Sequence, residues 1–205
     1  MKFTKFTFAV AAILVAALAV SCASSGGGNG GGAAKSAGPA GVWAFDDPAE
    51  ETAGWELTPS EFYQYRGDIA LSYDDATFGN GMLRLDVDFT NDINTEWSEP
   101  KLKIDLPKSI NMKGVTQFAF DFYYNPSYRT TGSFKAKVFS NNGASVDSAA
   151  DIVEDGEDAG DGFVKTNAVI LIMPTAGFLP DMRFSIAGSL TDYKGPVFLD
   201  NLRWE

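Results

Sequence analysis

Strict two-residue alternation in two segments limits most strongly what this chain can fold into. Residues 82–90 and 116–124 place an apolar side chain at every second position. Successive side chains of a strand point to opposite faces, so this period predicts β-strands with one buried face. Met82 is out of step with the first pattern. The residues expected to point inward are Leu83, Leu85, Val87, Phe89, Phe118, Phe120, Phe122 and Tyr124.

From Gly41 onward almost no helical periodicity occurs, and short β-rich runs alternate with Gly, Asn, Asp and Pro clusters. About ten short strands at this spacing predict an all-β fold, a jelly-roll β-sandwich of two antiparallel sheets. The expected strands are 42–46, 61–66, 69–73, 82–90, 101–106, 116–124, 133–139, 165–173, 182–187 and 197–204.

The start of the chain has the pattern of an export signal. Lys2 and Lys5 precede an apolar run over residues 6–20, and the single cysteine, Cys22, follows at once. We interpret residues 1–21 as a lipoprotein signal peptide and Cys22 as the lipid-modified first residue. The third position before the cysteine is alanine, where leucine is preferred, so an ordinary cleaved signal with an incidental cysteine is the alternative.

Residues 22–40 are rich in glycine and serine, a composition typical of a flexible tether. Residues 41–205 are then long enough for one folded domain. This organisation predicts a bacterial cell-envelope lipoprotein that reaches the membrane only through its lipid anchor. One cysteine cannot form an internal disulfide, so the core must supply the stability.

The charge balance excludes several kinds of partner. The chain has 16 Lys and Arg against 27 Asp and Glu, a net charge of −11, and loss of Lys2 and Lys5 would make it about −13. Such a surface repels nucleic acid and anionic lipid headgroups, whereas neutral sugars and cations stay compatible with it. The chain contains no histidine, which excludes histidine-based triads and metal sites.

Two acidic features need separate interpretation. Asp200 interrupts the apolar residues of the last expected strand, and a carboxylate there needs a partner, for which a bound cation is one answer. Residues 151–161 hold six acidic side chains without the ligand spacing of an EF-hand loop. We interpret that second stretch as a solvated acidic loop.

Four segments follow one another along the chain: Asp46–Trp55, Phe78–Leu85, Glu96–Glu99 and Gly195–Asn201. In this order they resemble a family 27 carbohydrate-binding module, a mannan-binding β-sandwich, and the resemblance covers residues 41–205. The Gly-Asn-Gly and Asp-Asn elements occur in many sugar-binding sandwiches. The spacing of Trp55 and Trp97 is the more specific part.

The resemblance implies that Trp55 and Trp97 are platforms on which sugar rings stack, because a flat indole matches the apolar face of a pyranose. Glu96 and Glu99 flank Trp97 and are candidate acceptors for sugar hydroxyls, with solvated surface charges as the alternative. Trp55 is equally compatible with a core position. Trp43 and Trp204 are expected to pack in the core.

One platform of the family has no counterpart in this sequence. A third aromatic is expected on a later strand, where this chain has Ser140-Asn-Asn-Gly-Ala-Ser145. Phe163 or Tyr128 are the candidates to replace it. Loss of one platform costs about 1–3 kcal/mol, by analogy with bases stacked on aromatic side chains. Mannan specificity is therefore less firmly predicted than sugar binding.

The resemblance also implies a structural Ca²⁺ between the first and last strands, with Asp46 and Asp200 as ligands. The alternative is an Asp200 that caps backbone amides without a metal. The implied function is non-catalytic binding of β-1,4-mannan, glucomannan or another neutral polysaccharide, for separate glycoside hydrolases to use.

Two rival functions stay open. A structural or protein-binding lipoprotein on the same fold would need no sugar. A jelly-roll glycosidase would need two carboxylates about 5–9.5 Å apart. Asp86 and Asp88 share the polar side of one strand, but a solvent face explains them, and the expectation is that the chain is not an enzyme.

Overall fold

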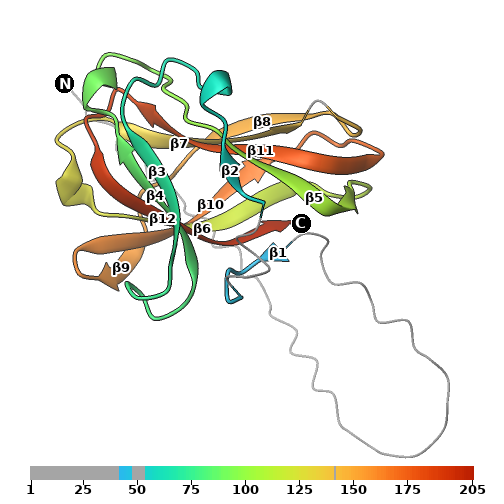
Figure 1. Cartoon of the computed structure of the whole chain (residues 1–205), viewed down its shortest axis with the longest axis horizontal. Coiled ribbons are helices and arrows are strands. Elements are labelled where there is room, and N and C mark those ends of the chain that lie inside the picture. Colours follow the sequence, from blue (N-terminus) through green and yellow to red (C-terminus); the bar gives the residue numbers. More distant parts are fainter. Residues whose placement is uncertain (1–41, 48–53, 141) are drawn as a thin grey trace, which may run out of the picture. The chain divides into compact units, whose positions relative to one another are not determined.

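Two antiparallel β-sheets pack face to face around one hydrophobic core (Figure 1). The computed structural model describes residues 42–47, 54–140 and 142–205. All of them belong to the unit Ser36–Glu205, which has its own core and is therefore able to fold without the residues before it. The predicted all-β sandwich of two antiparallel sheets is confirmed.

The larger sheet has the strand order β3-β4-β12-β6-β10-β9, with β1 paired to β12. Its strands are β1 (Val42–Trp43), β3 (Ile69–Asp74), β4 (Met82–Asp88), β6 (Gln117–Tyr124), β9 (Glu157–Gly160), β10 (Phe163–Leu171) and β12 (Lys194–Trp204). The smaller sheet has the order β2-β5-β11-β7-β8. Its strands are β2 (Glu56–Leu57), β5 (Leu102–Asn111), β7 (Ser133–Ser140), β8 (Val146–Asp151) and β11 (Phe178–Ser189).

The core follows the alternation of the sequence. The main hydrophobic cluster between the sheets contains all eight residues that were predicted to point inward. They lie on β4 and β6, except Phe89, which directly follows β4. Met82 instead joins a second cluster with Tyr123, Phe163 and Phe198. Trp43 and Trp204 are core residues, as predicted.

A β-bulge explains why the apolar pattern of β12 changes phase. Val197 and Leu199 point inward from odd-numbered positions. Further along the strand the inward residues are Leu202 and Trp204, at even-numbered positions. The register of β12 against β6 shifts between Asp200 and Arg203, and Asn201 has a φ of +50°. One extra residue in a strand moves the inward set by one position, and asparagine tolerates the left-handed backbone.

Apart from the ends of strands, the prediction differs from the structure in four segments. The two-residue strand β2 was not predicted. Residues 61–66 are not a strand: Pro59–Glu61 is a 3₁₀ turn, and Tyr63 forms a single bridge to Glu99. β8 and β9 were not predicted, because their alanine and aspartate residues have low β propensity and pairing with β7 and β10 imposes the strand. The acidic stretch 151–161 is thus the end of β8, a connection and β9.

Within the described residues, no helix is long and apolar enough to cross a membrane. The signal peptide, Cys22 and the tether predicted for residues 1–40 lie outside the described residues.

Candidate functional site

The outer face of the smaller sheet carries an aromatic and charged surface. In β7, Phe134, Ala136 and Val138 are buried, so the intervening Lys135, Lys137 and Phe139 point outward, each partly exposed. The register places Arg183 of β11 opposite Phe139 and Ser185 opposite Lys137. These side chains share one face because both strands are pleated in phase.

Trp97 lies at this face in a segment fixed by backbone hydrogen bonds. Ser98 and Gly188 exchange two N–H···O=C bonds of 2.9 Å each, and Glu99 and Tyr63 exchange two of 2.8 and 3.0 Å. The Lys135 ammonium lies 5.9 Å from the centre of a Trp97 ring. The indole is half-buried, in agreement with the polar sequence around it.

Glu99 fixes the orientation of this indole. Its side chain is only 3% exposed, and its Oε2 accepts a 2.8 Å hydrogen bond from Trp97 Nε1. Its Oε1 accepts a 2.9 Å bond from Ser185 Oγ. Both carboxylate oxygens are therefore engaged within the protein, and Glu99 acts on a ligand chiefly by holding Trp97. Glu96, in contrast, is exposed.

Phe139 is surrounded by three cationic groups. Lys101 Nζ, Lys137 Nζ and the Arg183 guanidinium lie 5.1, 5.2 and 5.9 Å from its ring centre. Lys137 pairs with Asp147 at 3.0 Å. Within the described residues Lys101 forms no ion pair, and its ammonium lies over the Phe139 ring in a cation–π contact.

Arg183 joins β11 to the turn that precedes Tyr63. Its Nε lies 2.9 Å from Glu61 Oε2, and its Nη1 lies 3.2 Å from Asp181 Oδ2. The pKa of Asp181 is lowered: burial would raise it, but hydrogen bonds from Ser140, Asn142 and Arg183 outweigh the burial. The charges on this part of the face are consequently compensated within the protein.

Trp97 separates two shallow hollows. One has a volume of about 320 Å³ and is lined by Tyr63, Trp97, Glu99, Lys101 and Lys137. The other, of about 250 Å³, is lined by Trp97, Lys135, Ala149, Ala150 and Asp151. We name these residues, together with Phe139 and Arg183, the Trp97 face. An extended ligand placed along β7 would contact both hollows.

Trp55 does not belong to the Trp97 face, and its expected role as an exposed platform is corrected. It is 7% exposed, packs in the core, and meets Trp43 edge-to-face with ring centres 5.7 Å apart. The cause is local: Leu57, two residues on, packs against the core, and alternation puts Trp55 on the same side. No ligand can stack on its ring in this structure.

The two suggested replacements for the third platform also lie elsewhere. Phe163 is 6% exposed in the second cluster, on the larger sheet, and Tyr128 packs against it with ring centres 6.1 Å apart. Sequence reasoning overlooked Phe139, which directly precedes the segment where the platform was sought. The signal was present, since Lys135, Lys137 and Phe139 are the outward half of an alternating strand. Tyr63, Lys101 and Arg183 were also overlooked.

Asp200 lies on the outer side of the larger sheet and is nevertheless buried. It is 3% exposed, its Oδ1 accepts a 2.7 Å bond from the Asn201 N–H, and its Oδ2 accepts bonds from the side-chain amides of Asn201 and Asn80. Burial raises the pKa of Asp200 to about 6, and the negative charges of Asp121 and Asp46 add to the rise.

The donors near Asp200 fit a calcium ion only in part. Carboxylates such as Asp200 and Asp46 are hard oxygen ligands, but Ca²⁺ takes about 6–8 of them. Among the described residues no group of three or more Asp, Glu, His or Cys could hold a metal. Backbone carbonyls, amide oxygens or water would have to complete the site.

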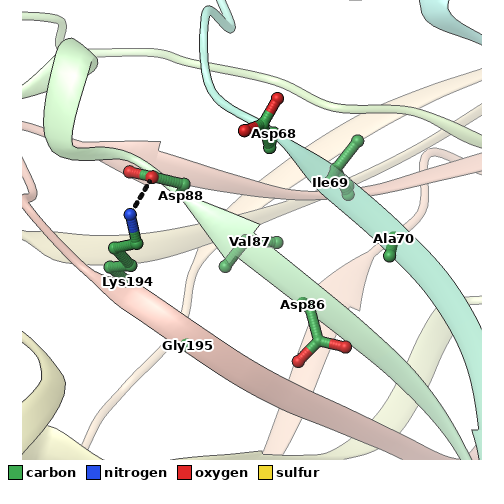
Figure 2. Close-up of a pocket in the computed structure, with 8 residues that line it drawn as sticks. All are labelled: Asp68, Ile69, Ala70, Asp86, Val87, Asp88, Lys194 and Gly195. Carbon is green, nitrogen blue, oxygen red and sulfur yellow. Dashed lines mark ion pairs between the residues drawn. The ribbon is translucent and has the colours of Figure 1, made fainter.

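Figure 2 shows a third hollow, at the outer side of the larger sheet between β3, β4 and the start of β12. It contains Asp86 and Asp88, the carboxylate pair considered for catalysis. Asp88 pairs with Lys194 at 2.7 Å and Asp86 with Arg84 at 2.7 Å. The pKa of Asp88 is lowered, because hydrogen bonds from Lys194 and Thr90 outweigh its burial. A general acid needs a raised pKa, so Asp88 is unsuited to that role.

Solved structures with a similar fold include several carbohydrate-binding modules. A family 28 carbohydrate-binding module described as specific for non-crystalline cellulose aligns with a TM-score of 0.57 and 22% identity, over 74% of this chain and 88% of its own. The chain shares the fold of carbohydrate-binding modules. Two family 27 modules align similarly. One, described for specific mannan recognition, has a TM-score of 0.59 and 18% identity, over 81% of this chain and 95% of its own.

The other family 27 module is from Caldicellulosiruptor saccharolyticus and was solved with mannohexaose. It has a TM-score of 0.54 and 21% identity, over 79% of this chain and 94% of its own. No family model matches the sequence, and no curated protein matches it.

Proposed function

We propose that this protein binds a polysaccharide on the Trp97 face without cleaving it. The observation that carries the proposal is the Trp97–Glu99–Ser185 arrangement, in which a buried carboxylate holds a half-buried indole between two open hollows. A preoriented aromatic ring loses little freedom on binding, and its face matches the C–H groups of a pyranose. Sugar hydroxyls would then meet the charged groups beside it.

The charges of the face support a neutral ligand. Lys135, Lys137 and Arg183 each pair with a carboxylate of the protein, which leaves Lys101 as the cation of the face without an ion pair in the described residues. Such a surface can hydrogen-bond hydroxyl groups and gives no net attraction to an anionic polymer. Among neutral polymers we favour β-1,4-mannan or glucomannan, which is supported by the family 27 structures that share the fold.

In the proposed cellular setting, Cys22 carries a lipid, residues 22–40 serve as the tether, and the sandwich captures polysaccharide at the bacterial cell envelope. Separate glycoside hydrolases would use the captured polymer. The support for this part comes from the sequence pattern of residues 1–40 alone.

Titration of residues 36–205 with mannohexaose, glucomannan and non-crystalline cellulose tests the proposal. Trp97→Ala should weaken binding by about 1–3 kcal/mol, roughly tenfold to a hundredfold, measured by isothermal titration calorimetry. Tyr128→Ala is the matched control, because that exposed aromatic lies in the 3₁₀ turn Pro126–Tyr128, packed against Phe163 and away from the Trp97 face. Its affinity should equal the wild-type value.

The outcomes separate the rival functions. Saturable binding lost only in Trp97→Ala establishes the Trp97 face as a sugar site, and the preferred polymer follows from the relative affinities. No heat with any glycan contradicts the proposal and favours a protein-binding role for the same face. Release of reducing sugar from any of these polymers would show an enzyme instead.

We also propose a structural Ca²⁺ at Asp46 and Asp200, supported by the buried Asp200 carboxylate, whose charge interacts with those of Asp121 and the exposed Asp46. A cation there would offset the burial of the Asp200 charge, which is the main cause of its raised pKa, and the smaller repulsion by Asp121 and Asp46. Calcium should then raise the melting temperature of the wild type, whereas Asp200→Asn should remove the increase. An equal response of both proteins to calcium would contradict the site.

A further inference from the structure

Lys101 differs from the other cations of the Trp97 face. Lys135, Lys137 and Arg183 lie 2.8, 3.0 and 2.9 Å from a carboxylate oxygen of the protein. Lys101 forms no ion pair within the described residues. An ammonium in bulk water needs no partner, but Lys101 is half-buried and lines the hollow beside Trp97. This position makes its free charge available to a bound ligand.

Lys101 is held at both its backbone and its side-chain end. Its carbonyl oxygen accepts hydrogen bonds from the Thr58 N–H at 3.0 Å and from Thr58 Oγ1 at 3.3 Å. Its ammonium lies 5.1 Å from the centre of the Phe139 ring. The ring occupies one side of the ammonium, and the remaining N–H donors stay available to a ligand. A group that is already positioned loses less freedom on binding.

The lining of this hollow favours a ligand group that accepts hydrogen bonds. Tyr63, Lys101 and Lys137 all carry donors. Glu99 is the one acidic side chain of the lining, and both its oxygens are already engaged within the protein. A sugar hydroxyl both donates and accepts, whereas an ionised carboxylate only accepts. A carboxylate therefore matches this hollow better than a hydroxyl group does.

The hollow on the other side of Trp97 has a different character. It is lined by both Lys135 and Asp151, whose charged groups lie 2.8 Å apart. A donor and an acceptor side by side suit the hydroxyl groups of a neutral sugar. The two hollows consequently favour different residues of one polysaccharide.

We propose that the hollow lined by Lys101 binds the carboxylate of a uronic acid residue, while the hollow lined by Lys135 binds neutral residues of the same polysaccharide. The carboxylate belongs to a side group or an isolated residue, because a protein of net charge −11 repels a polymer that is charged at every residue. At physiological salt the Debye length is about 8 Å, so distant acidic residues are screened and the contact with Lys101 decides. This inference rests on the proposed function.

Calorimetric titration of residues 36–205 with two ligands tests the inference. One is a set of glucomannan oligosaccharides, and the other is the same set after partial oxidation of the C6 hydroxyls to carboxylates. The oxidised set should bind about three- to thirtyfold more tightly, because a charge-assisted contact at a half-buried site exceeds an exposed ion pair. Lys101→Met should abolish this preference, and Lys101→Arg should keep it. Methyl esterification of the carboxylates should abolish it as well.

Lys103→Met is the matched control, because it changes the net charge equally. Lys103 lies on β5 outside both hollows and 2.9 Å from Asp105, so its loss should leave the preference intact. Equal binding of both ligands by the wild type would overturn the inference and leave the proposed function standing. A preference that survives in Lys101→Met, or is lost equally in Lys103→Met, would do the same. No heat with either ligand would overturn both.

Discussion

The outer faces of the two sheets differ although both arise from the same alternation of residues. On the larger sheet, Phe78 covers Met82, Tyr123, Phe163 and Phe198, and its ring centre lies 4.8 Å from that of Tyr123. On the Trp97 face, Trp97 and Phe139 stay half-buried beside cationic groups, and Tyr63 is exposed. One outer face is closed by a second apolar cluster, and the other is left open to a ligand. Half-buried aromatics, rather than the number of aromatics, therefore mark the candidate site.

The largest expected effect concerns the closed face. Phe198 is 1% exposed and touches Phe78 and Phe163. Phe198→Ala should lower the free energy of unfolding by about 3–5 kcal/mol, because it removes buried area and leaves a cavity. Urea denaturation of residues 36–205 measures this. Trp97→Ala is the comparison, and a loss from it equal to that from Phe198→Ala would show that the two faces are packed alike.

A smaller loss is expected where the open face meets the core. Glu99→Leu removes both acceptor oxygens at nearly constant volume, so Trp97 Nε1 and Ser185 Oγ both lose this partner. A buried polar group left without a partner costs about 1–3 kcal/mol. Denaturation should show this loss, and calorimetry should show weaker glycan binding. The exposed Glu96 gives the control, and a Glu96→Leu variant that binds as weakly as Glu99→Leu would contradict the positioning role of Glu99.

The sequence predicted the sandwich and its inward residues because alternation reports burial directly, as at Leu83 and Phe118. It favoured the surface for Trp97, whose neighbours are polar, but left Trp55 open between a platform and a core position, and in the structure the pairing of β2 with β5 places Trp55 inward. Phe139 was overlooked for a related reason. Its position on the open face depends on which sheet β7 joins, and this is decided by contacts with β11 that are distant in sequence.

The closed face also predicts a pH dependence. The raised pKa of Asp200, about 6 against an ordinary 3.8, means that the folded state binds its proton more tightly than the unfolded state. Stability from this group is present below pH 4 and is lost as the pH rises through 6. Relative to Asp200→Asn, the wild type should lose about 1–3 kcal/mol between pH 4 and 7 without calcium. Parallel pH profiles of the two proteins would contradict the assignment.

The smallest expected effect tests how Phe139 is used on the open face. Lys101 lies over this ring without an ion pair in the described residues, and an exposed cation–π contact is worth about 0.5–1 kcal/mol. A double-mutant cycle with Lys101→Ala and Phe139→Ala should give a coupling of about that size in unfolding experiments, whereas Lys113→Ala should show none. If the coupling is present, a sugar that stacks on Phe139 must first displace the ammonium. Phe139 would then be a weaker platform than Trp97, whose Nε1 is held at its edge by Glu99. If the coupling is absent, the ring is free, and the two aromatics of the open face should contribute equally to binding.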